Sequence, residues 1–407
     1  MKPACSIVIR AYNEEKHIGR LLTGIFQQTV KDVQVILVDS GSTDDTVKIA
    51  SGFPVEVVHI KPEEFSFGYS LNQGIRQCTA DYVVFASAHV YPVYPDWLEK
   101  LIQPFEDGKV ALTYGKQRGM ETTKFSEHMI FQHWFPDHSV GRQDHPFCNN
   151  ANAAIRRELW EQHPYDENIP ALEDLAWANW AQKQGYKIAY AGEAEIIHVH
   201  NETWPGVFNR YLREGMAFKR IYPQEKFSLW DLVRLFVVNS VNDMKQIGKV
   251  TYRMYGSPLT SSGGGENTDI PSTGSGIGRK TGSPLTSSGG GENTDIRSTG
   301  SGIGRKTGSP LTSSGGGGNT DIPSTGSAGG ARKSWPRTAY EIIRFRWAQF
   351  RGTYLGYKQS SAMLSWKLRQ TFYYPKQTMA PGEVKSRNVE PISYSETTGS
   401  HHSGRSE

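Results

Sequence analysis

The sequence has few cysteines, little net charge and no long apolar run. Its three cysteines are far apart and form no Cys-x-x-Cys pair, which argues against a disulfide framework or a zinc ribbon and fits a reducing compartment. No stretch approaches ~18 uncharged apolar residues and no secretory apolar segment follows the N-terminus, so a spanning helix is excluded. A net charge of +4 favours no particular partner. We therefore expect a cytoplasmic protein that contacts a membrane only peripherally, at its inner face.

Glycine is abundant, at 42 residues, but much of it lies in one repeated tract. The motif Ser-Pro-Leu-Thr-Ser-Ser-Gly-Gly-Gly begins at Ser257, Ser283 and Ser309, a period of 26 residues. Each unit has only leucine and isoleucine as core formers, too few to offset the entropy of an ordered chain. We predict a disordered insert over 256–334 that interrupts a helical region formed by 226–255 and 335–376, and a disordered tail over 377–407.

Upstream of the insert, short apolar runs alternate with helical patterns. The runs Ser6–Arg10 and Val33–Val38 are rich in β-branched residues, and Ile18–Phe26 between them has apolar side chains at helical spacing. Further strands are expected at Val55–Ile60, Asp81–Ala86, Val110–Tyr114, Phe147–Ile155 and Ile188–Val199, and further helices at Tyr69–Cys78, Asp96–Ile102 and Leu172–Gln184. The alternation predicts an α/β domain over 1–225, with a mostly parallel sheet flanked by helices.

Polar residues follow the first two strands at the point where each strand ends. Tyr12-Asn13-Glu14 follows the first, and Asp39-Ser40-Gly41-Ser42 follows the second. Ligands of open α/β sheets bind outside the carboxyl ends of the strands. An ionised Asp39 only accepts hydrogen bonds, which suits the N–H groups of a base or the hydroxyls of a ribose. For either segment alone, the alternative is capping of the strand end or of the helix that follows.

Together these two segments resemble the opening of the family-2, inverting nucleotide-sugar glycosyltransferases with the GT-A fold. The resemblance covers roughly residues 4–222, a little over half of the chain. It implies a Rossmann-like GT-A catalytic domain that uses a nucleotide-diphosphate sugar as donor and no organic cofactor. It also implies that Ala11, Tyr12, Glu14 and Asp39 line the nucleotide pocket.

Inverting sugar transfer needs a base within hydrogen-bond reach of the acceptor hydroxyl. Leu172-Glu173-Asp174-Leu175 supplies two adjacent carboxylates at the start of a predicted helix. The pair resembles the Glu-Asp motif of the family, whose aspartate is the base in close relatives, so Asp174 is assigned as the base. The alternative is that both carboxylates only favour the positive end of the helix dipole.

The sequence departs from the family where two aspartates usually flank one residue and bind Mg²⁺ or Mn²⁺. The matching positions read Ser87-Ala88-His89, so a hydroxyl and an imidazole replace two carboxylates. In one interpretation, His89 binds a softer ion such as Mn²⁺ beside His198 or His200, which share one strand face. In the other, no metal binds, and His89 with nearby cations donates directly to the diphosphate. The sequence leaves both open.

Other segments match the family in position. Asn72, before the fourth strand, would face the nucleotide, although its segment also reads as an ordinary helix start. Asn149, Asn150 and Asn152 lie on the expected acceptor side and could donate to sugar hydroxyls or stabilise a loop. The stretch from 120 to 147 is expected to be a mobile, aromatic-rich acceptor loop.

The segment after the insert is basic and aromatic. Its side chains Ile343, Trp347, Phe350, Tyr354 and Tyr357 are spaced as one helical stripe. Such a helix lies flat on an anionic bilayer, or packs on the catalytic domain with its basic side in solvent. The composition would also suit nucleic acid, but no recognition motif accompanies it, so we expect no nucleic-acid partner.

The leading hypothesis is a hexosyl- or deoxyhexosyltransferase that acts on a glycan or a lipid-linked saccharide. A nucleotidyltransferase would need a glycine-rich phosphate loop with a cation after the first strand, and Ala11–Glu15 contains neither. A catalytically inactive sugar-nucleotide-binding or scaffold protein of the same fold is the alternative. The missing aspartates support that alternative, and the Glu173-Asp174 pair opposes it.

Overall fold

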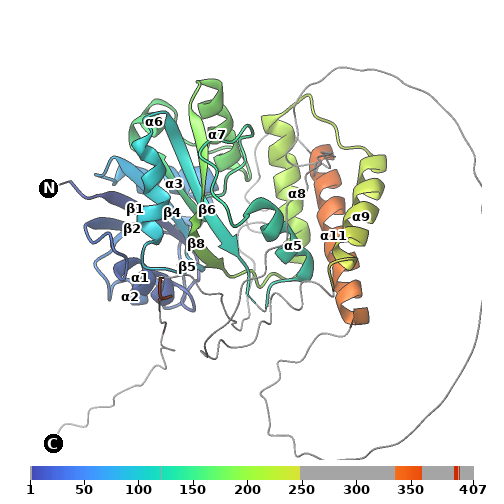
Figure 1. The fold of residues 1–407 in the computed structure, drawn as a ribbon, viewed down its shortest axis with the longest axis horizontal. Helices are drawn as coiled ribbons and strands as arrows, with labels where there is room; N and C mark the ends of the chain where they lie inside the picture. The colour runs from blue at the N-terminus through green and yellow to red at the C-terminus, as the bar shows by residue number, and fades with distance from the viewer. Residues whose placement is uncertain (1, 121, 248–334, 360–388, 393, 395–407) are drawn as a thin grey trace, which may run out of the picture.

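The computed structural model describes residues 2–120, 122–247, 335–359, 389–392 and 394 (Figure 1). The predicted insert at 256–334 and most of the predicted tail lie outside the described residues. The described chain forms a central sheet with helices on both faces and a separate layer of three long helices, α8, α11 and α9, beside it (Figure 1).

One eight-stranded sheet organises the α/β part, in the order β3-β2-β1-β4-β7-β6-β8-β5. The strands are β1 Cys5–Ala11, β2 Val33–Asp39, β3 Glu56–His59, β4 Tyr82–Ser87, β5 Val90–Pro92, β6 Val110–Arg118, β7 Asn152–Arg156 and β8 Lys187–His198. Neighbours are parallel except at β7, which runs antiparallel to β4 and β6, and at β5, which runs antiparallel to β8. The structure therefore confirms an α/β fold, with β7 shorter than the predicted strand and β5 not foreseen.

Helices cover the two faces of the sheet and form the separate layer. The α-helices are α1 Ile18–Phe26, α2 Thr46–Ala50, α3 Phe67–Arg76, α4 Trp97–Ile102, α5 Phe125–Trp134, α6 Arg157–Gln162, α7 Glu173–Lys183, α8 Trp204–Ile221, α9 Leu229–Met244 and α11 Trp335–Lys358, and the 3₁₀ turns are η1 Pro62–Glu64 and η2 Gln103–Glu106. Helix α5 lies in the stretch where we expected an acceptor loop.

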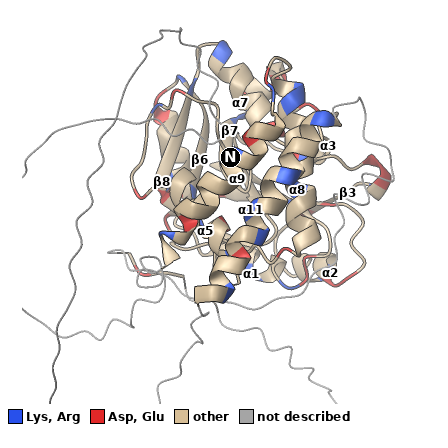
Figure 2. Ribbon diagram, turned by 90° about the vertical axis from the view of Figure 1, so that its right-hand side faces the viewer, with Lys and Arg blue, Asp and Glu red and all other residues tan. Residues whose placement is uncertain are grey.

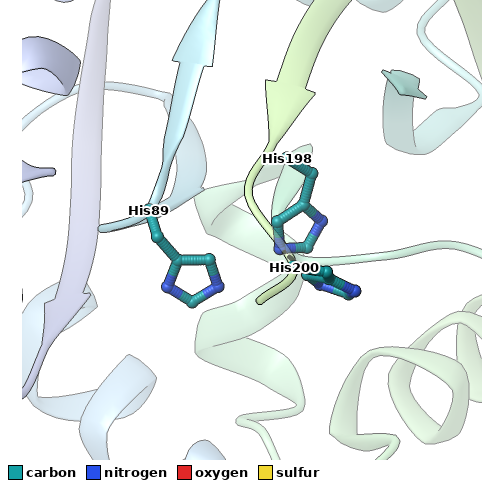
Figure 3. A group of neighbouring side chains, drawn as sticks. All are labelled: His89, His198 and His200. Carbon is teal, nitrogen blue, oxygen red and sulfur yellow. Dashed lines mark hydrogen bonds between the residues drawn. The ribbon is translucent and has the colours of Figure 1, made fainter. Parts of the chain in front are cut away.

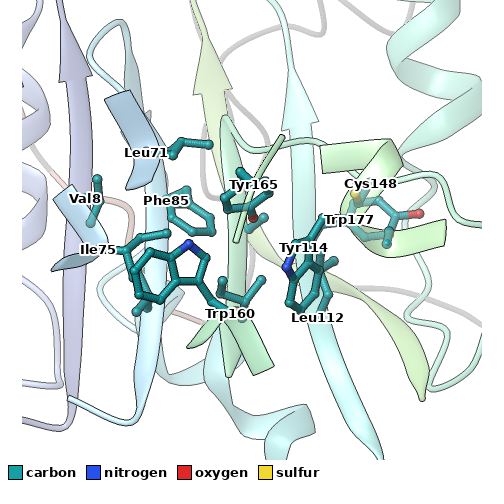
Figure 4. Close-up of a cluster of buried hydrophobic side chains, with 14 of the residues drawn as sticks. Val8, Leu71, Ile75, Phe85, Leu112, Tyr114, Cys148, Trp160, Tyr165 and Trp177 are labelled. Atoms are coloured by element: carbon teal, nitrogen blue, oxygen red, sulfur yellow. The ribbon is translucent and has the colours of Figure 1, made fainter. Parts of the chain in front are cut away.

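The sheet buries a different set of side chains on each face. Val8 and Phe85 point to one side, where they pack with α3, α6 and α7 side chains such as Leu71 and Trp160 (Figure 4). Ile7 and Ile9, one residue away along β1, point to the other side and pack on α1 and α4. Burial on both faces explains why the strands are continuous apolar runs, since each fully buried side chain contributes about 1.5–3 kcal/mol.

Close backbone contact joins α8 to α11. A Cβ atom on Gly352 would lie 2.7 Å from the Phe208 carbonyl oxygen, and one on Gly215 would lie 2.6 Å from that of Thr353. Glycine is needed at these two crossings because any side chain would force the helices apart.

A buried ion pair joins α11 to α9. Arg346 donates from Nε to Asp243 Oδ2 at 2.7 Å and from Nη2 to Oδ1 at 2.9 Å, and both side chains are almost fully buried. A bidentate pair fixes the relative position of two helices because both bonds must be kept together.

The predicted aromatic stripe of α11 is divided between two sides of the helix. Phe350 and Tyr357 are buried and Tyr354 is half-buried against α8 and α9, whereas Ile343 and Trp347 are exposed. Of the two interpretations of this stripe, packing within the protein applies to its second half, because α11 lies between two neighbouring helices.

Part of the predicted tail is ordered. The Ile392 N–H donates to the Val93 carbonyl oxygen at 3.1 Å, and the Tyr394 hydroxyl donates to that of Pro92 at 2.7 Å. The tail prediction is wrong for these residues because Tyr394 packs beside Tyr91, an apolar contact that composition does not reveal. Within the described ranges, no helix combines the length and apolarity needed to cross a bilayer.

Candidate active site

Strand register brings the polar strand ends to one edge of the sheet. Ala11 pairs with Asp39 on β2, and Arg10 pairs with Ser87 on β4. A hydrogen bond joins the loops after β1 and β2, since the Asn13 side-chain oxygen accepts from the Thr43 N–H at 2.8 Å. Three of the predicted site residues, Ala11, Asp39 and Ser87, therefore lie at neighbouring strand ends.

The Asp39 carboxylate mainly shapes the loop that follows β2. It is 2% exposed and accepts from the backbone N–H groups of Gly41 at 3.2 Å and Ser42 at 3.1 Å. His59 Nδ1 lies 3.2 Å from the same carboxylate. Capping, the alternative reading of Asp39, is thus present in the structure, and any contact of Asp39 with a nucleotide stays a prediction.

The predicted base lies at the first turn of α7. Asp174 Oδ2 accepts from the Asn150 backbone N–H at 3.1 Å, and Oδ1 accepts from the Leu175 N–H at 2.7 Å. Leu172, the N-cap of α7 two positions before Asp174, has φ 59° and ψ 30°, the left-handed region that residues other than glycine rarely adopt. Such strain costs of order 1–3 kcal/mol and is concentrated at functional sites, where the surroundings hold it.

Two opposing influences act on the Asp174 carboxyl. Burial and the adjacent Glu173 carboxylate raise the pKa of Asp174 to about 7, while its two backbone hydrogen bonds and Arg10 oppose that rise. Glu173 is itself buried and pairs with Arg10, whose Nη1 lies 3.3 Å from Glu173 Oε1. A carboxylate with a pKa near neutral is well matched to accept a proton from a hydroxyl during reaction.

Arg10 was missed as a site residue, although a cation that interrupts an apolar strand was a visible signal. Its guanidinium lies over the Phe67 ring, 4.7 Å from the centroid, and that of Arg213 lies 5.1 Å from the same centroid. Two guanidinium groups therefore meet at one ring beside the Glu173-Asp174 pair. They provide positive charge at the edge of the sheet where the polar strand ends meet.

Three histidines converge at the same edge. His89 follows β4 and directly precedes Val90. The pairing of β5 with β8 places His198 opposite Val90, so His198 lies beside His89 (Figure 3). Each of His89, His198 and His200 offers a ring nitrogen, and these nitrogens lie within 4.8 Å of one another. The prediction that they could share an ion is therefore geometrically consistent.

Each histidine ring is oriented by an oxygen acceptor at Nδ1. These contacts are His89 to Glu14 Oε1 at 2.8 Å, His198 to Gln117 Oε1 at 2.8 Å and His200 to Glu127 Oε1 at 2.7 Å. Because these oxygens accept, each Nδ1 carries a proton, and whenever the ring is neutral its Nε2 keeps a lone pair. The Nε2 atoms of His198 and His200 are 2.9 Å apart, so these two ring nitrogens point at each other.

The pKa values of two of these rings are displaced in opposite directions. Burial and the neighbouring histidines hold the pKa of His198 well below its ordinary range, so this ring is neutral. Burial also lowers the pKa of His89, but the Glu14 carboxylate more than offsets it, and the net pKa is raised. His198 is thus prepared to bind an ion, while His89 is also suited to donate a proton.

Two predicted ligand contacts are corrected by the structure. Asn72 is buried and its side chain bonds the Tyr165 backbone, the Trp160 indole and Glu167, so it does not face a nucleotide. Asn152 is fully buried. Its side chain accepts from the Trp97 indole and donates to two backbone carbonyls. Both predictions are wrong because tertiary contacts from distant segments take up every polar atom of these amides.

The remaining asparagines lie beside the predicted base. Asn150 is buried and, besides its backbone bond to Asp174, directs Nδ2 toward Glu173 Oε1 at 3.4 Å. Asn149 is half-buried and accepts from the Ala151 N–H at 2.9 Å. Tyr12 is half-buried in the loop after β1, near Glu14. Asn150 is therefore a positioning residue for the carboxylate pair.

Comparison with known proteins identifies the family of this chain. Residues 6–163 match the family model described as glycosyl transferase family 2. The O-antigen chain rhamnosyltransferase WbaN of Salmonella anatum is 30% identical over 234 residues, which cover 53% of this chain and 72% of that protein. The chain belongs to glycosyltransferase family 2. The predictions of the family, of the fold class and of a nucleotide-sugar-dependent glycosyltransferase are thus confirmed.

Two further proteins are similar to this glycosyltransferase. The O-antigen chain rhamnosyltransferase RfbN of Salmonella typhimurium is 27% identical over 224 residues, which cover 52% of this chain and 71% of that protein. A mannosyltransferase from Pyrobaculum calidifontis, solved with GDP-Man and Mn²⁺, is 18% identical with a TM-score of 0.45, over 64% of this chain and 77% of that chain.

Proposed function

We propose that this glycosyltransferase moves a deoxyhexosyl group of the rhamnosyl type from a nucleoside diphosphate sugar to a hydroxyl of a glycan or a lipid-linked saccharide, with inversion. Its relatives named as O-antigen chain rhamnosyltransferases support the sugar class and a role in polysaccharide assembly. The observation that carries the mechanism is the buried Asp174 carboxyl, which two backbone N–H groups orient and whose pKa lies near neutral.

In the proposed reaction, the acceptor hydroxyl oxygen attacks the anomeric carbon from the face opposite the diphosphate. A new C–O bond forms as the bond to the diphosphate breaks, and the leaving diphosphate keeps the electron pair. The hydroxyl proton moves to Asp174, which is ionised at the start of the step. Arg10 holds Glu173 and contributes positive charge beside the pair, so two adjacent carboxylates are tolerated in a buried site.

Family 2 implies a divalent ion at the diphosphate, and the residues present fit one class of ion. The convergent Nε2 atoms of His89, His198 and His200, each with its Nδ1 bonded to an oxygen, form a nitrogen donor set that suits a transition metal, and of the two ions that the family uses, Mn²⁺ is the softer. They fit Mg²⁺ poorly because that ion prefers oxygen ligands. When bound, the ion supplies positive charge to the leaving diphosphate. The metal-free alternative, direct donation from His89, draws on the raised pKa of that ring.

Calorimetric titration of the full chain with Mn²⁺ and with Mg²⁺ separates the two alternatives without measuring turnover. We expect Mn²⁺ to bind and Mg²⁺ to bind far more weakly, and we expect His198→Ala to abolish Mn²⁺ binding. His138→Ala, an exposed histidine on the loop after α5, is the matched control and should bind as the wild type does. Wild-type protein that binds no divalent ion, and transfers sugar in the presence of a chelator, would establish the metal-free alternative.

Release of nucleoside diphosphate from a panel of sugar nucleotides, with and without glycan acceptors, tests the reaction. We expect release to be fastest with a deoxyhexose donor and to fall about 10²–10⁴-fold in Asp174→Asn, since that is the usual contribution of a positioned base. Affinity for the nucleoside diphosphate should stay within a few-fold, because the base acts in the chemical step. If the wild type releases diphosphate from no donor, the inactive sugar-nucleotide-binding alternative is correct.

A further inference from the structure

Exposed apolar side chains are concentrated on two helices. Every large hydrophobic side chain that is exposed in the described part of the chain belongs to α9 or α11. We call this surface the α9/α11 face; its members are Leu229, Trp230, Val233, Val237, Val238, Val241, Trp335, Tyr340, Ile343 and Trp347. Their exposed fractions range from 42% to 71%, with Trp230 the most exposed. Apolar residues scattered singly need no explanation, but a grouped set marks an interaction surface.

The face is continuous across the two helices. Trp230, Val233, Val237 and Val241 follow one another at spacings of three and four on α9, and Tyr340, Ile343 and Trp347 do the same on α11. The Phe236 and Trp347 rings meet edge to face at 5.6 Å, which links the two stripes.

The opposite sides of both helices are already used in packing. Leu232 and Leu235 of α9 are buried with α8 and α11 side chains, and Ile342 and Phe345 of α11 are fully buried. Figure 2 shows α9 and α11 side by side, turned toward the viewer, with lysine and arginine marked in blue along them. The apolar stripe is therefore the outward side of a packed layer and not an incomplete core.

Charged side chains at exposed positions of these helices are all cationic. They are Arg234 on α9, Lys245 directly after it, and Arg337, Arg344, Arg351 and Lys358 on α11. The acidic residues of the same helices each have a partner: Asp243 pairs with Arg346 in the interior, Asp231 lies 3.8 Å from Arg234, and Glu341 accepts from the Phe125 N–H. Tryptophan and tyrosine among apolar side chains, bordered by cations, are what an anionic membrane interface attracts.

We propose that the α9/α11 face docks on the surface of a bilayer that contains anionic lipids. Apolar side chains enter the boundary between headgroups and acyl chains, and the six cations contact lipid phosphates. A symmetric contact between two copies fits less well, because it would bring cations of one copy against cations of the other with no exposed acid between them. The proposal depends on this surface alone and not on the sugar-transfer reaction.

Co-sedimentation of the full chain with phosphatidylcholine vesicles, with and without phosphatidylglycerol, tests the proposal. We expect binding that requires phosphatidylglycerol and weakens as salt rises. Trp230→Ser with Trp347→Ser should reduce the partition coefficient at least tenfold through the loss of two interfacial anchors. Arg337→Gln with Arg344→Gln should reduce it about fivefold for each arginine, while the apolar side chains stay in place.

A charge-matched control distinguishes vesicle binding through the α9/α11 face from attraction due to the overall charge of the protein. Lys31→Gln with Lys183→Gln removes two exposed cations on other parts of the fold and should bind vesicles as the wild type does. Equal losses in this control and in the arginine variant would overturn the proposal in favour of nonspecific attraction. A wild-type protein that does not bind anionic vesicles would also overturn the proposal. If that protein instead forms a dimer that the double tryptophan variant abolishes, the face is a contact between copies.

Discussion

Replacing Glu173 with glutamine removes a negative charge beside Asp174 while keeping the size of the side chain. The Glu173 carboxylate is the second largest cause of the raised pKa of Asp174, after burial. Two carboxylates ~5 Å apart at an effective dielectric constant of about 20 repel each other by about 3 kcal/mol. Arg10, 3.3 Å from Glu173, already offsets part of that repulsion. We therefore expect the pKa of Asp174 to fall in the variant, by about one pH unit.

The sign of the effect on activity follows from the role of the base. Asp174 must be ionised to accept a proton, so the turnover of the wild type should rise as pH increases through about 7 and then level off. In Glu173→Gln the rise should come about one pH unit earlier, and at pH ~6 the variant should retain about fivefold more of its own plateau rate than the wild type.

The assay is kcat as a function of pH, with donor and acceptor both saturating, each variant being compared with its own plateau. Glu158→Gln, an exposed glutamate on α6, is the charge-matched control and should leave the profile unchanged. Arg10→Gln should displace the rise toward higher pH, because it removes a cation that favours the ionised carboxyl. An unmoved midpoint in Glu173→Gln, or one moved to higher pH, would refute the coupling of these carboxylates.

Two further predictions concern the helical layer, each measured as the free energy of unfolding in urea. Asp243→Ala leaves the Arg346 guanidinium buried without its counter-ion and should cost about 3–5 kcal/mol, whereas exposed Lys245→Ala should be nearly neutral. Gly352→Ala places a Cβ 2.7 Å from a backbone oxygen of α8 and should cost about 1–3 kcal/mol, whereas Gly108→Ala enters open space. Equal effects of a variant and its control would contradict the packing described.

The sequence alone was sufficient for the features that depend on neighbouring residues. A buried strand is a short β-branched run and a packed helix repeats its apolar side chains every three to four residues, so β1, α1 and β2 were predictable in place and order. The polar residues at the ends of β1 and β2 and the Glu173-Asp174 pair were equally local, and together they indicated the family that the comparisons confirm.

Tertiary structure decided which of the polar side chains remain available for a ligand. Asn72 looked like a ligand contact in the sequence, but its oxygen accepts from the Trp160 indole, 88 positions along the chain. Arg10 reaches Glu173 across a still longer separation, and only the pairing of β5 with β8 brings His89 next to His198. The α9/α11 face likewise exists only because α8 covers the other side of α11 and α11 covers the other side of α9. Hydrogen bonds and packing between distant segments determine which polar and apolar side chains stay exposed. The periodicity of residues along the chain does not reveal these contacts.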